Sequence, residues 1–141
     1  MNILITMGGR AFICGPRISE IAAAASIGMN VLSGPHVCAC HDPGNEGVTG
    51  VIVLSTSHCS IHIWDKADVP HARIDVYSCK KFEMCDVERM LDELNPSHYD
   101  YMLVDRNKAG PVTVGNGSFF AVANGGGEIV AKPGRSFLTT R

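Results

Sequence analysis

The sequence predicts an α+β fold, a two-layer α/β sandwich in which about two helices cover one face of a mostly antiparallel sheet. Three observations support this prediction. Segments with the character of strands outnumber helical ones, the connections between them are short, and 45% of the 141 residues are hydrophobic. A chain of this length and composition can bury a core. The high hydrophobic fraction and the low charged fraction of 18% exclude a disordered chain. The formal charge of -2 excludes a basic nucleic-acid-binding face.

Strands are expected where apolar residues alternate or form short β-branched runs between turn residues. The cluster Asp42-Pro43-Gly44-Asn45 is such a turn. A buried strand is expected over 47–55, and the next strand over 58–64 alternates. Further extended segments are expected at 2–7, 10–14, 30–41 and 73–79.

Two helices are expected. Residues 18–27 are rich in alanine, with Pro16 just before them and Gly28 after them. The second helix covers 84–94, where Val87, Leu91 and Leu94 recur on one face. From residue 101 onward, short apolar pieces are separated by glycine-rich turns. The predicted organisation is therefore one domain over 1–100 and a C-terminal extension of short strands over 101–141.

The chain contains six cysteines and six histidines, which raises the question of disulfides, metal or catalysis. The N-terminal segment has neither the basic start nor the apolar stretch of a secretion signal, so a cytoplasmic protein with reduced thiols is expected. No apolar run is long enough to span a membrane.

A histidine- and cysteine-rich segment offers one candidate metal site. On a strand, His36, Cys38 and Cys40 would share a face, with His41 next to them. Gaps of one residue hold ligands apart, whereas structural zinc sites favour wider spacings. We therefore predict no metal, and a metal-binding module remains an alternative.

The segment from Gly47 to Cys79 is the most informative. Ser57 lies at a sharp junction between two apolar strands and His58 follows it, which is compatible with a nucleophile or with an ordinary turn serine. His62 lies five residues beyond Ser57. This odd interval places the two side chains on opposite faces unless the strand begins after Ser57.

Residues 47–64 read GVTGVIVLSTSHCSIHIW and residues 75–79 read DVYSC. This pattern resembles the prokaryotic S-adenosylmethionine decarboxylase proenzymes, whose core reads approximately GVSGVVVIxESHxxIHTWPE and is followed by a DVFTCG strand. His41 and Gly9-Arg10 also fall at family-like positions. The resemblance is strongest over 41–79 and is absent after about residue 100.

The resemblance implies a pyruvoyl cofactor made from Ser57. The Ser57 hydroxyl attacks the carbonyl of Thr56, and elimination then splits the chain into a β chain of 1–56 and an α chain from 57. His62 would be the base for this step and Thr49 would supply a stabilising hydroxyl. The substrate amine would form a Schiff base with the pyruvoyl ketone, and Cys79 would donate the proton that replaces CO2.

The residues that would contact the substrate are Asp65, His58 and His41. Three positions depart from the family pattern: Thr56 replaces a glutamate, Asp65-Lys66 replaces Pro-Glu, and Pro43 replaces an aromatic residue. The last two alter the expected contacts to the nucleoside.

The resemblance implies a carboxy-lyase of spermidine and polyamine biosynthesis, acting on a small molecule as a homodimer of processed αβ protomers. The altered nucleoside contacts favour, as an alternative, a pyruvoyl-dependent ornithine or arginine decarboxylase. The Thr56 substitution and the unfamiliar tail favour a second alternative, an unprocessed homologue without catalytic activity.

Overall fold

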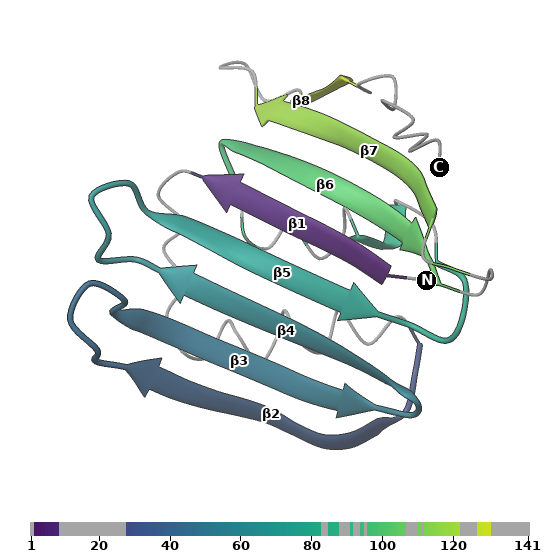
Figure 1. The fold of residues 1–141 in the computed structure, drawn as a ribbon, viewed down its shortest axis with the longest axis horizontal. Coiled ribbons are helices and arrows are strands. Elements are labelled where there is room, and N and C mark those ends of the chain that lie inside the picture. Colours follow the sequence, from purple (N-terminus) through teal and green to yellow (C-terminus); the bar gives the residue numbers. More distant parts are fainter. Residues whose placement is uncertain are drawn as a thin grey trace.

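The computed structural model describes residues 2–8, 28–82, 85–87, 91, 94, 96–106, 110, 112–121 and 127–130. These residues form one eight-stranded sheet in the order β2-β3-β4-β5-β1-β6-β7-β8 (Figure 1). Every neighbouring pair is antiparallel. The strands are β1 (Asn2–Gly8), β2 (Val31–Cys40), β3 (Gly47–Leu54), β4 (Ser57–Trp64), β5 (His71–Tyr77), β6 (His98–Asp105), β7 (Val112–Ala121) and β8 (Gly127–Val130).

Short connections join β2 to β3 and β3 to β4. Between β2 and β3, the Asn45 N–H donates to the Asp42 carbonyl over 2.9 Å. Gly44 in this turn has φ 80°, a left-handed conformation that glycine adopts without strain. Between β3 and β4 only Ser55 and Thr56 lie outside the strands, and Leu54 pairs with Ser57. The β3–β4 pairing is therefore a hairpin with a two-residue turn.

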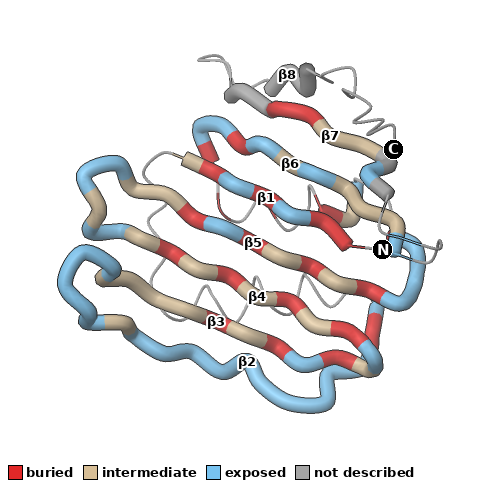
Figure 2. The backbone as a smooth tube through the Cα atoms, in the orientation of Figure 1, coloured by how far each residue is buried: buried red, intermediate tan, exposed pale blue. Residues whose placement is uncertain are grey.

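One face of the sheet carries the core. Burial alternates along the central strands, as Figure 2 shows, so every second side chain points into the core. On β4 these are Cys59, Ile61 and Ile63, each no more than 3% exposed. The same cluster contains Phe82, Val87, Leu91 and Leu94, which lie between β5 and β6 in the sequence, together with Ile3, Ile5, Met7, Met29, Ile52, Leu54, Ala72, Ile74, Val76 and Tyr99.

The opposite face is more open, and we call it the open face. It carries the alternate residues of the same strands, and their exposed apolar side chains include Leu4, Val53 and Met102, which are 44%, 39% and 43% exposed. The edge strand β2 is exposed along nearly its whole length (Figure 2). Among the described residues, the sheet thus has one face that carries the core and one face that no element covers.

The mostly antiparallel sheet is confirmed, whereas the prediction of two helices is not borne out. The helix expected over 18–27 and the strand expected over 10–14 lie outside the described residues. Within 84–94, residues 85–87 and 91 are helical. The described part is dominated by the sheet because β6, β7 and β8 continue the antiparallel sheet beyond β1.

The boundary expected at residue 100 falls within β6, and β7 and β8 extend the same sheet. Among the described residues, no helix is both long and apolar enough to cross a membrane.

Candidate active site

Ser57 is the first residue of β4 and is 7% exposed. Its Oγ accepts a hydrogen bond of 3.0 Å from the Cys79 N–H and lies 3.9 Å from the Met29 sulfur. Thr56 precedes it in the turn with φ 53° and is exposed. The Thr56–Ser57 peptide bond therefore joins an exposed turn residue to a serine whose oxygen is held in place.

Cys79 follows the end of β5 and is exposed. Its Sγ lies 3.0 Å from the Thr56 hydroxyl. Hydrogen bonding with Thr56, followed by that with Ser57 and by the charge of Lys80, lowers the pKa of the Cys79 thiol. The structure thus brings together three of the residues expected from the sequence, Thr56, Ser57 and Cys79.

Thr49 and His62 form a second group on the open face. They are direct partners in the β3–β4 register, and the Thr49 Oγ1 lies 3.0 Å from the His62 Nδ1. The His62 ring also lies 6.0 Å from the Trp64 ring, at a tilt of 41°. A cross-strand hydroxyl therefore orients the imidazole.

These two groups do not meet within the chain. Ser57 and His62 are five residues apart on β4, which corresponds to about 17 Å along a strand. Because β4 begins at Ser57 itself, the odd interval also places the two side chains on opposite faces. The His62 imidazole cannot reach its own Ser57 in this structure.

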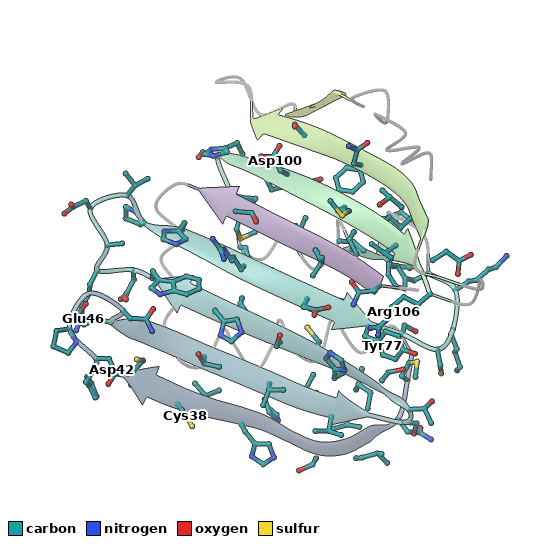
Figure 3. The ribbon with its side chains drawn as sticks, viewed as in Figure 1. Cys38, Asp42, Glu46, Tyr77, Asp100 and Arg106 are labelled. Carbon is teal, nitrogen blue, oxygen red and sulfur yellow. The ribbon has the colours of Figure 1, made fainter. Side chains whose placement is uncertain are left out.

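A stack of rings lies on the open face next to Ser57 and Cys79. The rings of His58 and Tyr77 stack with centroids 5.6 Å apart, and the Arg106 guanidinium lies 5.0 Å from the Tyr77 ring centroid. Figure 3 shows Tyr77 and Arg106 close together at the same end of the sheet. Sequence reasoning missed both residues: Tyr77 sits inside the motif DVYSC, but nothing in the sequence around Arg106 signals a site.

His41 and Asp65 lie at the other end of the sheet. They directly follow Cys40 and Trp64, the last residues of β2 and β4, and both are exposed. Trp64 anchors this end by donating a 2.7 Å hydrogen bond to Asn45. His41 and Asp65 are therefore on the His62 side of β4, far from Ser57, while His58 is on the Ser57 side.

No group of three or more metal-ligating side chains occurs among the described residues. Cys38 is exposed on β2 (Figure 3), and none of the five described cysteines forms a disulfide. Cys59 differs from the others because burial, together with the Asp75 charge, raises its pKa to about 12. It is a core thiol.

Comparison with known proteins decides the family. The family model described as S-adenosylmethionine decarboxylase matches residues 18–107. The chain belongs to this family. The S-adenosylmethionine decarboxylase match includes Thr49, Thr56, Ser57, His62 and Cys79, and it ends before β7 begins.

Curated relatives agree with this assignment. The S-adenosylmethionine decarboxylase proenzyme of Hydrogenobaculum sp. (strain Y04AAS1) is 38% identical over 65 residues, which cover 43% of this chain and 46% of the relative. The proenzyme of Sulfurihydrogenibium sp. (strain YO3AOP1) is 37% identical over 68 residues, which cover 47% of this chain and 50% of the relative. The chain thus spans about half the length of the curated relatives it matches.

A solved structure shows the same fold. The adenosylmethionine decarboxylase from Aquifex aeolicus superposes with a TM-score of 0.57 at 24% identity, over 76% of this chain and 93% of that chain.

Proposed function

We propose that this protein is a self-cleaving, pyruvoyl-dependent S-adenosylmethionine decarboxylase of polyamine biosynthesis, cleaved between Thr56 and Ser57. The observation that carries the proposal is the geometry of the turn. The oxygen of the buried Ser57 is held by the Cys79 N–H directly after the exposed Thr56, and the Cys79 thiol lies next to the Thr56 hydroxyl. Family membership supports the reaction class.

Cleavage uses the chain's own atoms. The Ser57 Oγ attacks the Thr56 carbonyl carbon, and breaking the Thr56–Ser57 C–N bond leaves an ester. A base then removes the Ser57 α-hydrogen, and the Thr56 carboxylate leaves from Cβ. The resulting dehydroalanine takes up water and loses ammonia, which gives the pyruvoyl group at the new N-terminus. No external oxidant is required.

The pyruvoyl ketone supplies covalent catalysis, since it condenses with an amine and accepts the electron pair released with CO2. The residues around it supply orientation and protons. Cys79 lies close enough to deliver a proton at this position, because its main chain contacts Ser57 and its sulfur contacts Thr56. The stacked rings of His58 and Tyr77 offer a flat surface for a substrate ring.

The base for elimination comes from a second copy of the chain. His62 is about 17 Å from Ser57 along β4, and Thr49 is its partner on β3. One chain therefore holds two separate halves of a site. In a twofold dimer, the Thr49–His62 pair of each copy can face the Ser57–Cys79 group of the other, which creates two equivalent sites. Asp65 and His41 would enter from the same side as His62.

The open face supports this dimer. Leu4, Val53 and Met102 leave apolar surface exposed on it, and no described element covers this face. Packing two open faces together would bury this surface and bring His62 of one copy toward Ser57 of the other. We also propose a cytoplasmic location, where the described thiols would stay reduced.

Coexpressing two inactive variants tests both the self-cleavage and the role of a second copy of the chain. Neither Ser57→Ala nor His62→Ala chains should cleave alone. When they are coexpressed, the intact His62 of the Ser57→Ala chain should cleave the His62→Ala chain, giving fragments that end at Thr56 and start at residue 57.

The matched control coexpresses His62→Ala with the double variant Ser57→Ala/His62→Ala, which offers no His62 and should stay intact. Cleavage of His62→Ala on its own would refute the role of His62. A wild-type chain that stays intact by mass would refute the pyruvoyl proposal. Release of labelled CO2 from S-adenosylmethionine, but not from ornithine or arginine, tests the substrate.

A further inference from the structure

The Thr56 hydroxyl makes two close contacts. Its oxygen lies 2.7 Å from the Ser55 carbonyl oxygen and 3.0 Å from the Cys79 sulfur. The two partners come from segments 24 residues apart in sequence. Thr56 thus links the turn that contains the scissile bond to the cysteine beside it.

One hydroxyl proton serves both contacts. When the Thr56 O–H donates to the Ser55 carbonyl, its oxygen can accept from the Cys79 S–H. When Cys79 is a thiolate, the same hydroxyl can rotate and donate to the sulfur. The contact therefore holds the sulfur in either protonation state, and its donor form favours the thiolate, in line with the lowered pKa of Cys79.

The backbone that presents this hydroxyl is strained. Thr56 has φ 53°, a left-handed conformation that is unfavourable for a β-branched residue. Glycine or asparagine is the usual choice for a left-handed position at the end of a two-residue turn. The closed hairpin maintains the strain, because Leu54 and Ser57 are paired on either side of the turn.

We propose that Thr56 is a positioning residue that holds the Cys79 sulfur in the uncleaved chain and releases it when the Thr56–Ser57 bond is cleaved. This inference rests on the proposed self-cleavage. Once the bond is broken, Thr56 becomes a chain end and the turn no longer imposes its conformation. Its hydroxyl is then free to leave Cys79, and the new chain end adds a negative charge to this end of the sheet.

Both changes act in the same direction on the thiol. Loss of a donor to the sulfur and gain of a neighbouring negative charge both raise the pKa of Cys79. A proton donor must carry its proton at working pH. Cleavage would therefore convert Cys79 from a thiol held by the turn into the protonated acid that the mature site needs.

Alkylation of Cys79 measures this directly and does not depend on catalytic turnover. Trypsin cleaves after Arg73 and Lys80, so the peptide IDVYSCK contains Cys79 as its one cysteine. The peptide FEMCDVER contains only Cys85 and serves as an internal reference. Native protein is treated with iodoacetamide at pH 7.5, quenched, digested and quantified by mass spectrometry.

The first comparison uses the uncleavable Ser57→Ala chain with and without Thr56→Val. Valine keeps the shape of threonine and removes the hydroxyl. Alkylation of Cys79 should slow by about twofold to fivefold, the effect of losing one hydrogen bond at an exposed site, while Cys85 is unchanged. Thr56→Ser in the same background keeps the hydroxyl and should keep the rate. An unchanged Cys79 rate in Thr56→Val overturns the positioning role.

The second comparison uses cleaved wild type and cleaved Thr56→Val. Like the Ser57→Ala chain, both cleaved proteins lack the Ser57 hydroxyl, so this group does not differ between the samples. Their Cys79 rates should be equal, and the midpoint of alkylation against pH should be higher than in the intact Ser57→Ala chain. If Thr56→Val slows the alkylation of Cys79 equally in cleaved and uncleaved protein, the proposal that cleavage releases Cys79 from Thr56 is wrong. If wild type never cleaves, the proposed function and the release both fail, and the first comparison still decides the positioning role.

Discussion

Replacing Thr49 by valine tests how the hydroxyl beside His62 contributes to cleavage. Valine fits the same half-buried strand position but removes the 3.0 Å contact between Thr49 Oγ1 and His62 Nδ1. If the hydroxyl only orients the imidazole, the loss is that of one hydrogen bond, about 1 kcal/mol, and cleavage slows about fivefold.

A larger effect has a different meaning. If the Thr49 hydroxyl also donates to the oxyanion formed when Ser57 attacks the Thr56 carbonyl, the loss resembles that of an oxyanion-hole donor, about 100-fold to 1,000-fold. We expect this larger effect, because the resemblance gives the hydroxyl that role. The assay follows conversion of the full chain into two fragments by intact mass after rapid purification.

Thr49→Ser is the matched control. It retains the oxygen and loses a methyl group, so it should cleave within a few-fold of wild type. Thermal unfolding of both variants checks that the β3–β4 hairpin is intact. A Thr49→Val chain that cleaves as fast as wild type would refute any role for the Thr49–His62 contact in cleavage.

Three further predictions concern the sheet. Gly47→Ala should lower the free energy of unfolding by about 1–3 kcal/mol, since an added Cβ would lie 2.1 Å from the Ile63 carbonyl oxygen, whereas Gly110→Ala meets nothing within 4 Å and should be neutral. Denaturant titration checks both. Ile74→Ala, at a site 2% exposed in the core, should cost about 2–5 kcal/mol in the same titration. Burial raises the Cys59 pKa from 9.0 to about 12, so its contribution to stability should be complete below pH 9 and lost as pH rises toward 12. Cys59→Ala should flatten that decline, and an equally steep decline in the variant would contradict the assignment.

Local sequence patterns predicted the strands well because each pattern is a property of a single segment. The alternation in 58–64 corresponds to β4, and the β-branched run 47–55 corresponds to β3. The order of strands could not be predicted in this way. β1 lies between β5 and β6, and its partners are about 60 to 100 residues away in sequence. No periodicity within a segment carries information about such pairing.

The residues of the candidate site could be predicted from the sequence, but the contacts between them could not. The resemblance supplied Ser57, His62, Cys79 and Thr49 through their spacing along the chain. It supplied neither the contact between Thr56 and Cys79 nor the position of Arg106 over Tyr77, because both join segments that meet only in the folded sheet.

The odd interval between Ser57 and His62 can be interpreted only once the structure shows where β4 begins. A strand that begins after Ser57 could have left the serine free to turn toward His62. Because Ser57 instead pairs with Leu54 and begins β4, its side chain faces the core side while His62 faces outward. Alternation is a geometric property of a strand, so no rotamer change in one chain closes a gap of about 17 Å. Under the proposed self-cleavage, a base on the open face of one copy therefore acts on the serine that another copy supplies.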